Sequence, residues 1–402
     1  MKILFVSANY PPQAKGGGEL STHYIAQGLI GRGHQVRVVT SGDREEEYEV
    51  QGVPVKKLPV KINAKPLLEK NHSKKVAKVL ESYIKSVGDF DVIHAHDFRS
   101  ALALSEIISD NMIVTVRDYA QICGSPNNLL VDGTICPGCN SLPVAMKNEA
   151  VARASMARKP FRVWQYWWNV EYRKEAFRKF KRHIYISHAQ MEQTRLQQDL
   201  SGIKTRVIYN PVPSEYLKEP RVNTLNETIL YVGTLGSYKG VGLLLEAFHD
   251  VSKEFPNAFL KIVGEGEQKK SFEQFVARNG LQYKVEFAGR IDFDMMRHVY
   301  DQTSIVVAPH LWIEPFGRTV VEGMSRGKIV ISANAGGPGE IIEDSVTGLL
   351  FKKGSKNDLV SVISRALEMK DLERREIGQA ARVWVANNIN QNEIARQYEL
   401  AY

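Results

Sequence analysis

The stretch that decides the fold begins with the apolar run Ser304-Ile-Val-Val-Ala308. It continues as Pro309-His-Leu-Trp-Ile-Glu-Pro-Phe-Gly-Arg-Thr-Val-Val-Glu-Gly-Met324. The apolar run predicts a buried parallel strand, and Gly317 marks the start of a helix. The first backbone N–H groups of a helix have no partner inside it, and the helix dipole is positive there. The turn between strand and helix therefore favours an anion.

Two carboxylates flank this predicted anion site. Glu314 precedes the helix start, and Glu322 lies about five residues into the helix, roughly 7–8 Å along its axis. A carboxylate accepts two hydrogen bonds and suits a pair of neighbouring hydroxyl groups. A nucleotide sugar fits this arrangement, because it has hydroxyls at both ends and phosphate between them. The spacing alone favours two solvated glutamates at an ordinary turn.

The full string resembles the E-x7-E signature of retaining glycosyltransferases of family 4 (GT4), which have the GT-B fold. Here the signature runs from Glu314 to Glu322, with Pro-Phe-Gly after the first Glu. The resemblance extends over most of the chain. It implies an α/β protein with two doubly wound, Rossmann-like domains facing across a cleft. The N-terminal domain would bind the acceptor, and the C-terminal domain the nucleotide sugar.

Composition agrees with this reading. A length of 402 residues favours two domains, and three cysteines argue against a disulfide framework. The net charge of +8 is consistent with anionic ligands or an anionic membrane surface. No nucleic-acid recognition motif is present. No apolar run is long enough for a membrane span, and Met1–Ser7 predicts a first strand, so a cytoplasmic location is expected.

The predicted linker follows from composition, whereas the domain boundary near Asn210 and the roles of the two domains are implied by the resemblance. Residues 1–210 would form the acceptor domain and 227–387 the nucleotide-sugar domain, joined by a polar, Pro-containing linker over 211–226. The resemblance implies that the last helix, about 388–402, packs back on the first domain.

A glycine-rich turn, Gly16-Gly17-Gly18, follows the first strand and precedes a helix predicted from Glu19 to about Arg32. The pattern is a βαβ unit whose glycines let the backbone approach a ligand closely. It does not satisfy the dinucleotide fingerprint, and a plain flexible turn is the alternative. The resemblance implies that this loop faces the donor phosphates and the acceptor.

Two further predicted strands end in polar residues. The string Asp91–Asp97 contains His94 and His96, which we expect to line the ligand-binding edge of the sheet, with metal binding as a minor alternative. The next strand ends at Arg117 and Asp118, and His96 and Asp118 are assigned to the acceptor side. Many GT4 members have His at the position of Arg117. The resemblance places Arg117 of this chain among the catalytic residues. A fixed cation could hold an acceptor phosphate or carboxylate, but it is not a base near neutral pH.

Two segments of the first half leave alternatives open. Cys123, Cys136 and Cys139 have a zinc-type C-x2-C spacing but lack a fourth ligand, and an acceptor loop with reduced thiols is the alternative. Residues 143–182 predict a helix rich in Trp and basic residues. They fit either an interfacial surface on an anionic membrane or a soluble helix with Trp packed inward. The residues concerned are Trp164, Trp167, Trp168, Arg173, Lys174, Arg178 and Lys179.

The second half opens with a strand over 228–233 and a phosphate-type loop over 234–240. GT4 enzymes usually carry Arg and Lys in this loop, where they neutralise the leaving diphosphate. This chain keeps Lys239 but has Thr234 in place of the Arg. It is therefore one cation short unless Arg318 or Arg290 substitutes.

The roles that the resemblance implies converge on the central motif. Glu314 would orient the sugar hydroxyls, Glu322 would hold the ribose diol, and Lys239 with the helix start would stabilise the diphosphate. The catalytic residues would be Glu314, Lys239 and Arg117. The donor-binding residues would be Gly16, Gly17, Gly18, Thr234, Gly289, Arg290, Phe316, Gly317, Arg318, Thr319 and Glu322.

The predicted function is transfer of a sugar from a nucleotide-sugar donor to a glycan, lipid-linked or small-molecule acceptor. Retention of anomeric configuration follows from the resemblance, and we expect no cofactor and no divalent metal. One alternative is a non-catalytic GT-B protein that binds a nucleotide sugar. Another is a metal-dependent transferase using Asp292 and Asp294 as a D-x-D motif, although Asp at a helix start is an ordinary cap. An interfacial 143–182 segment would make the protein peripheral on the inner face of the membrane.

Overall fold

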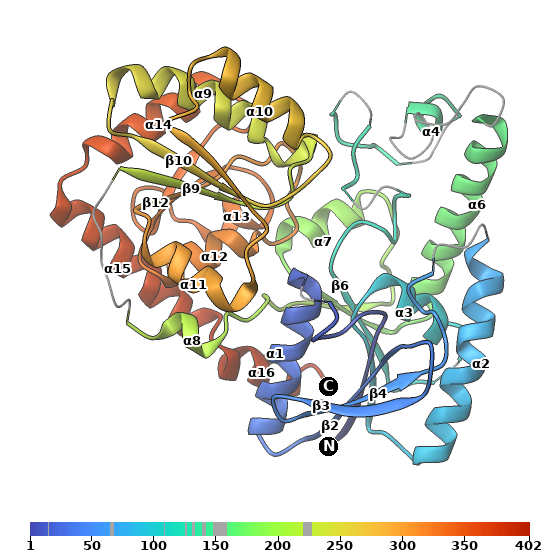
Figure 1. Ribbon diagram of the computed structural model, residues 1–402. Coiled ribbons are helices and arrows are strands. Elements are labelled where there is room, and N and C mark those ends of the chain that lie inside the picture. The colour runs from blue at the N-terminus through green and yellow to red at the C-terminus, as the bar shows by residue number, and fades with distance from the viewer. Residues whose placement is uncertain are drawn as a thin grey trace. The chain divides into compact units, whose positions relative to one another are not determined.

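The computed structural model describes residues 1–14, 16–64, 68–107, 109–124, 127–130, 133–138, 142–147, 159–219 and 227–402. The chain divides into two compact units. Unit 1 comprises Met1–Pro211 and Gln391–Tyr402, and unit 2 comprises Val212–Asn390. Both chain ends therefore belong to unit 1 (Figure 1). Of the predicted linker, residues 212–219 belong to unit 2, and 220–226 lie outside the described residues.

Unit 1 is built on an eight-stranded sheet with the order β3-β4-β2-β1-β5-β6-β7-β8. All neighbouring strands are parallel except the antiparallel pair of β3 and β4. In chain order its elements are β1 (Lys2–Ser7), α1 (Gly17–Gly31), β2 (Gln35–Ser41), β3 (Glu46–Val50), β4 (Val53–Leu58), α2 (Glu69–Val87), β5 (Val92–Ala95), α3 (Phe98–Leu104), β6 (Met112–Val116), α4 (Leu142–Lys147), α6 (Lys159–Arg178), β7 (Arg182–Tyr185), α7 (His188–Arg195), β8 (Lys204–Val207) and α16 (Gln391–Glu399).

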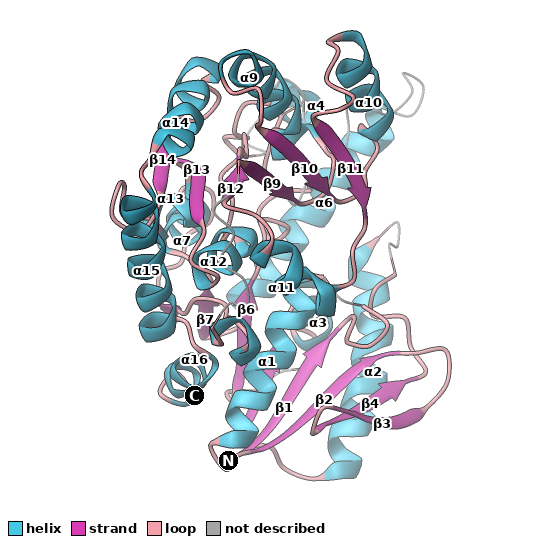
Figure 2. Cartoon of the chain, turned by 60° about the vertical axis from the view of Figure 1, so that its left-hand side comes forward, coloured by secondary structure: helices cyan, strands magenta, loops and turns pink. Residues whose placement is uncertain are grey.

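Helices cover both faces of this sheet (Figure 2). The side chains of α2, α3 and α6 form one core with the strands, and α16 packs against α1. Gly28 of α1 permits that close packing, because a Cβ there would lie 2.8 Å from the Cβ of Ala395. The central strands are continuous apolar runs, which is why both faces of the sheet can be buried.

Unit 2 has a six-stranded, wholly parallel sheet with the order β11-β10-β9-β12-β13-β14. Its elements are α8 (Ser214–Leu217), β9 (Thr228–Val232), the 3-10 helix η2 (Ser237–Lys239), α9 (Val241–Glu254), β10 (Phe259–Val263), α10 (Lys269–Arg278), β11 (Val285–Gly289), α11 (Phe293–Asp301), β12 (Ile305–Ala308), α12 (Arg318–Ser325), β13 (Ile329–Ala333), α13 (Gly336–Ile341), β14 (Leu349–Phe351), α14 (Lys356–Glu368) and α15 (Asp371–Asn388).

Three expectations need correction. The helix predicted to reach residue 182 ends earlier, because α6 ends at Arg178 and Arg182 begins β7; residues 148–158, between α4 and α6, lie outside the described part. The indole rings on α6 are not packed inward, since Trp164, Trp167 and Trp168 are exposed. Arg173, expected on a basic surface, is buried. No helix in the described part of the chain has the length and hydropathy of a membrane span.

Candidate active site

The strand order of unit 2 reverses between β9 and β12, the position at which doubly wound sheets bind their ligands. The chain leaves β9 toward β10 on one side, whereas β12 pairs with β9 on the other, so the strand order reverses there. The loops after these two strands meet, because the N–H of Leu311 donates to the carbonyl of Tyr238 at 2.9 Å. Gly240, at φ 75°, permits that approach, since a Cβ there would lie 1.9 Å from the carbonyl oxygen of Pro309.

Glu314 lies after β12 and has two side-chain hydrogen-bond donors. Its Oε2 accepts from Nζ of Lys239 at 2.7 Å and from Nε1 of Trp312 at 2.8 Å. The Lys239 ammonium also lies 4.9 Å from the centre of the Trp312 ring. Both bonds are made to Oε2, so Oε1 keeps its capacity to accept a ligand hydroxyl. The prediction that Lys239 and Glu314 belong to one site matches this contact.

Glu314 is ionised at neutral pH. Burial alone would raise the pKa of its carboxyl group, but the charge of Lys239 and the neighbouring His310 outweigh burial, so the pKa lies below its ordinary value. The side chains of Lys239 and Glu314 are still 23% and 17% exposed, so a ligand can reach the pair.

The backbone around Glu314 is held by the loop after β13. The N–H of Gly337 donates to the Glu314 carbonyl at 2.8 Å. Gly336, at φ 67°, lies so close that a Cβ there would be 2.2 Å from the Glu314 carbonyl oxygen. Phe316 is buried, so it packs this turn and does not present its ring to a ligand. The segment before α12 is therefore held by the backbone of Gly336 and Gly337 and by the buried ring of Phe316.

Glu322 already has protein partners at both carboxylate oxygens. Nε of Arg318 lies 2.6 Å from Oε1, and the hydroxyl of Tyr300 donates to Oε2 at 2.9 Å. Arg318 also stacks 5.0 Å from the centre of the Phe293 ring. Burial, followed by the charge of Glu322, raises the pKa of Tyr300 well above its ordinary value, so Tyr300 stays a donor. A ribose diol at Glu322 must use its remaining lone pairs or displace Arg318.

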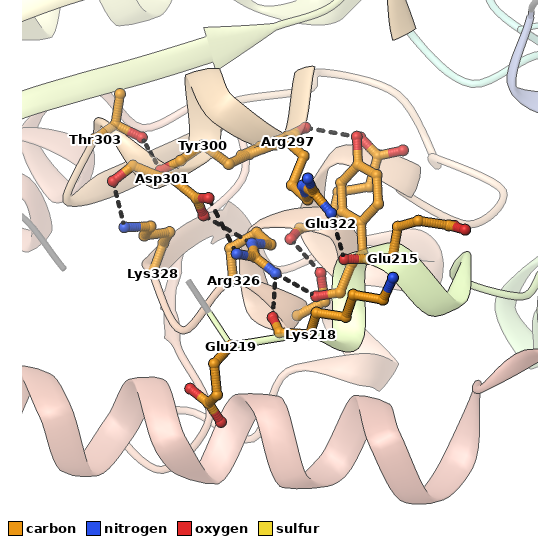
Figure 3. A network of polar contacts seen from close by, with 12 residues as sticks. Glu215, Lys218, Glu219, Arg297, Tyr300, Asp301, Thr303, Glu322, Arg326 and Lys328 are labelled. Atoms are coloured by element: carbon orange, nitrogen blue, oxygen red, sulfur yellow. Dashed lines mark hydrogen bonds and ion pairs between the residues drawn. The ribbon is translucent and has the colours of Figure 1, made fainter. Parts of the chain in front are cut away.

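A buried polar network joins the end of α11 to the residues that follow α12 (Figure 3). Arg326, 1% exposed, donates from Nε to Asp301 at 2.8 Å and from Nη1 to the carbonyls of Tyr216 and Lys218. Lys328 donates to the Asp301 carbonyl at 3.1 Å. This network ties α8 to the start of β13. Nothing in the local sequence predicted it, because its partners are far apart along the chain.

The other predicted donor residues of unit 2 are not all gathered at Glu314. Thr319 contacts the end of β9, with its hydroxyl 3.5 Å from the Val232 carbonyl. Thr234 is exposed in the loop after β9. Gly289 and Arg290 lie at the end of β11, two strands away from β9, and Arg290 is exposed. Gly317 is the N-cap of α12, at φ 83°.

The remaining predicted residues belong to unit 1. Gly16, Gly17 and Gly18 form the start of α1, and a Cβ on Gly18 would lie 3.4 Å from the Arg117 side chain. Arg117 donates to the His96 carbonyl at 2.9 Å and to Asn210 at 2.6 Å. Its guanidinium therefore fastens strand ends of unit 1 together. This geometry indicates a positioning residue.

Two acceptor-side residues have displaced pKa values. Burial, with the nearby His94 and Arg117 charges, holds the pKa of His96 well below its ordinary value. Nδ1 of His96 lies 3.1 Å from an Arg117 nitrogen, which can only donate, so Nε2 carries the hydrogen. Burial raises the pKa of Asp118. His94 is fully buried and bonds to Thr115 and Tyr402.

The metal alternatives gain no support within the described residues. No group of three or more His, Cys, Asp or Glu is arranged there to hold a metal ion. Asp292 is the N-cap of α11 and Asp294 lies in its first turn, and both are exposed. Cys123 and Cys136 are buried and not joined by a disulfide, and Cys139 lies outside the described residues.

Curated relatives of this chain include glycosyltransferases. An uncharacterized glycosyltransferase of Methanocaldococcus jannaschii is 26% identical over 386 residues, which cover 91% of this chain and 89% of the relative. The lipopolysaccharide 1,2-N-acetylglucosaminetransferase of Salmonella typhimurium is 29% identical over 180 residues, covering 42% of this chain and 46% of the relative.

Solved structures confirm the predicted GT-B fold. The sucrose-phosphate synthase from Thermosynechococcus elongatus superposes with a TM-score of 0.75 at 20% identity, covering 100% of this chain and 98% of that one. Anabaena HepE in complex with UDP and glucose gives a TM-score of 0.71 at 20% identity, with the same coverage.

The family assignment rests on two sequence families that together span both units. The family described as "Glycosyl transferases group 1" matches residues 214–384, and the family described as "Glycosyltransferase Family 4" matches residues 15–216. The two matches meet where the units divide. This chain belongs to glycosyltransferase family 4.

Proposed function

We propose that the chain transfers a sugar from a nucleotide-sugar donor to an acceptor, with retention of anomeric configuration and without a divalent metal. The observation that carries the proposal is the Lys239–Glu314 pair at the strand reversal of unit 2, 2.7 Å apart and beside the start of α12. A carboxylate with one open oxygen suits sugar hydroxyls. The adjacent ammonium and the helix start suit a diphosphate. UDP is bound in HepE, which shares the fold.

In this mechanism the enzyme acts mainly on the leaving group. As the bond between sugar and diphosphate breaks, negative charge grows on the diphosphate. Lys239 and the first N–H groups of α12 stabilise that charge more in the transition state than in the ground state. Glu314 holds the sugar hydroxyls in the reactive orientation, and its own orientation is fixed by Trp312.

Unit 1 would bind the acceptor, a glycan or a lipid-linked sugar. Asp118 and the N–H of His96 are the polar groups proposed for that role. The raised pKa of Asp118 makes it a better proton acceptor than an ordinary carboxylate. Arg117 positions His96 by bonding to both its carbonyl and its ring.

A second candidate function is nucleotide-sugar binding without transfer. Two substitutions relative to the family pattern favour it: Thr234 replaces the usual Arg, and Arg117 replaces the usual His. Both remove a group that would act on the reacting centre. A thermal-shift screen of nucleotide sugars, followed by an assay for transfer or donor hydrolysis, separates the two functions. Stabilisation without turnover by any acceptor or water would favour the binding protein.

The donor assignment is tested by two alanine variants with different expected defects. Glu322→Ala should weaken binding of the free nucleoside diphosphate about tenfold to 150-fold, because a hydrogen bond to a charged group is lost. Glu314→Ala should bind the diphosphate nearly as the parent does, because Lys239 keeps its charge, and should lose turnover, because the contact to the sugar hydroxyls is removed. Glu368→Ala, at an exposed glutamate of α14, is the control for both. If both site variants bind the diphosphate as well as the parent does, the assignment of α12 as the donor site is wrong.

Metal independence is tested on the same assay. Turnover should survive EDTA, because Lys239 and backbone N–H groups are proposed to meet the diphosphate. Loss of activity with EDTA and its recovery with manganese would instead support the Asp292 and Asp294 alternative.

A further inference from the structure

Four large aromatic side chains are exposed together on the first three turns of α6. Phe161, Trp164, Trp167 and Trp168 are 49%, 46%, 56% and 50% exposed. The Trp164 ring lies 6.0 Å from the Trp168 ring at an interplanar angle of 25°, and 6.0 Å from the Phe161 ring. Single exposed apolar residues are common, whereas a contiguous patch marks an interaction surface. We call these four residues the aromatic ridge.

The ridge cannot be buried by rotation of α6, because the opposite side of the helix is fixed. Arg173 of α6 is buried and makes two bonds to Glu69 of α2, at 2.7 and 2.6 Å. It also donates to the carbonyls of Ala120 and Cys123, at 2.8 and 2.9 Å. Figure 1 shows α2 and α6 on the same side of unit 1. These contacts keep the opposite side of α6 against unit 1 and leave the ridge exposed.

Charge is distributed unevenly between the units. Unit 1 carries 31 Lys and Arg against 22 Asp and Glu, a net charge of +9, whereas unit 2 carries 22 against 23, a net charge of −1. Much of the excess lies around the ridge in sequence, since residues 147–182 hold eleven Lys and Arg and three Glu. An anionic surface is therefore attracted to unit 1 and not to unit 2.

We propose that the aromatic ridge docks unit 1 on an anionic lipid bilayer. Indole rings favour the headgroup level of a bilayer, where the ring body is in apolar surroundings and the N–H is hydrated. Basic residues beside such rings attract anionic headgroups, and the two effects add. The core of a protein–protein interface is instead depleted of charge, which does not fit a ridge within such a basic segment.

Vesicle co-sedimentation tests the proposal on the full chain. Vesicles of phosphatidylcholine with about a third phosphatidylglycerol should bind the protein, and pure phosphatidylcholine should bind it weakly. Binding should decline as sodium chloride rises from about 0.05 M to about 0.5 M, because headgroup attraction is screened. A variant with Trp164→Gln, Trp167→Gln and Trp168→Gln should bind the anionic vesicles roughly tenfold less or weaker still.

Matched controls separate the ridge from general surface hydrophobicity. Tyr283→Gln and Leu372→Gln alter side chains of unit 2 that are 92% and 69% exposed, and should leave vesicle binding unchanged. The triple variant should keep its thermal unfolding midpoint, because the altered rings are exposed. Donor binding by unit 2, measured by calorimetry, should also be unchanged. Calorimetry thus tests the donor assignment, and vesicle binding tests the membrane proposal, so either can fail without the other.

Fluorescence gives a direct reading of insertion. In a background with Trp312→Phe and Trp384→Phe, only the three ridge indoles emit, and brominated lipids in anionic vesicles should quench them.

Several results would overturn the proposal: no binding to anionic vesicles, equal binding by the triple variant, equal binding to neutral vesicles, or binding without quenching. Loss of a dimer in the triple variant, on size-exclusion chromatography, would assign the ridge to a second copy of the chain. Stacking of a free glycan on the indoles, with no vesicle binding, would assign it to an acceptor.

Discussion

Arg318 and Glu322 form an ion pair across one turn of α12, with 2.6 Å between Nε and Oε1. Arg318 is the first residue of that helix, where the dipole favours anions. A diphosphate bound there would compete with Glu322 for the guanidinium, since both are anions. Family 4 enzymes usually have an Arg at the position of Thr234, after β9. We propose that Arg318 supplies the positive charge that Thr234 lacks.

The first prediction follows from that competition. Arg318→Gln should weaken binding of the nucleoside diphosphate about tenfold to 150-fold, the effect of one charge-assisted hydrogen bond, and leave binding of the free nucleoside unchanged. Arg318→Lys should retain part of the affinity, because the charge is kept but the forked geometry is lost. Calorimetry with both ligands provides the measurement. Equal losses for nucleoside and diphosphate would mean that Arg318 acts only by orienting Glu322.

The second prediction concerns Trp312, whose Nε1 donates to Glu314 at 2.8 Å. Trp312→Phe removes that donor but keeps an aromatic ring beside Lys239. We expect kcat to fall about tenfold, because Glu314 is less well oriented when the sugar bond breaks, with diphosphate affinity unchanged. Trp384→Phe is the control, since Trp384 is half-buried on α15. A fall in diphosphate affinity without a fall in kcat would place Trp312 on the nucleotide instead.

The third prediction concerns stability. Asp301→Ala leaves the guanidinium of Arg326 buried without its carboxylate, which costs about 3–5 kcal/mol in the free energy of unfolding. Glu219→Ala breaks the pair with Arg382, in which the Glu219 side chain is 82% exposed, and should cost about 1 kcal/mol or less. Urea unfolding of both variants tests the difference. Similar losses in the two variants would show that the buried pair adds no more than an exposed one.

The parallel strands could be predicted from the sequence, because each is a local apolar run. The loops could be predicted as the turns that follow these runs. The edge strand β3 could not. It contains Glu46, Glu47 and Glu49, and charged residues on a strand usually argue against one. Here two of them pair with lysines of β4: Lys57 donates to Glu46 at 2.9 Å, and Lys56 lies 3.2 Å from Glu47. The connecting turn places Gln51 at φ 46°, where Gly or Asn is usual.

At the candidate site, the E-x7-E motif predicts roles for Glu314 and Glu322, and the loop after β9 predicts one for Lys239. The side chains that hold these residues in place are not part of either pattern. Tyr300 reaches Glu322 from another helix, and no spacing rule joins residues of separate elements. The contacts of Arg117 within unit 1 were also beyond local reasoning. Its residue type indicates a charge for a ligand, whereas its bonds to His96 and Asn210 indicate a tie within unit 1. Long-range contacts of this kind depend on the assembled fold.

The last prediction is the pH dependence of Asp118→Asn. Burial raises the pKa of Asp118 above its ordinary value of 3.8, so the folded protein holds this proton more tightly than the unfolded chain does. The contribution of Asp118 to stability is therefore present below pH 3.8 and is lost as the pH rises through the folded pKa. Asn keeps an oxygen for the N–H of Ala120, which donates to Asp118 at 2.8 Å, and carries no charge. The variant should thus match the parent in acid and be more stable at neutral pH, while acceptor-dependent turnover falls.

Asp110→Asn is the control with the opposite sign, because the hydrogen bond from Lys181 lowers the pKa of Asp110. Urea unfolding from about pH 4 to about pH 8 measures both differences. An Asp118→Asn variant that is less stable at neutral pH would show that Arg173 and Arg99 stabilise the carboxylate by more than burial costs.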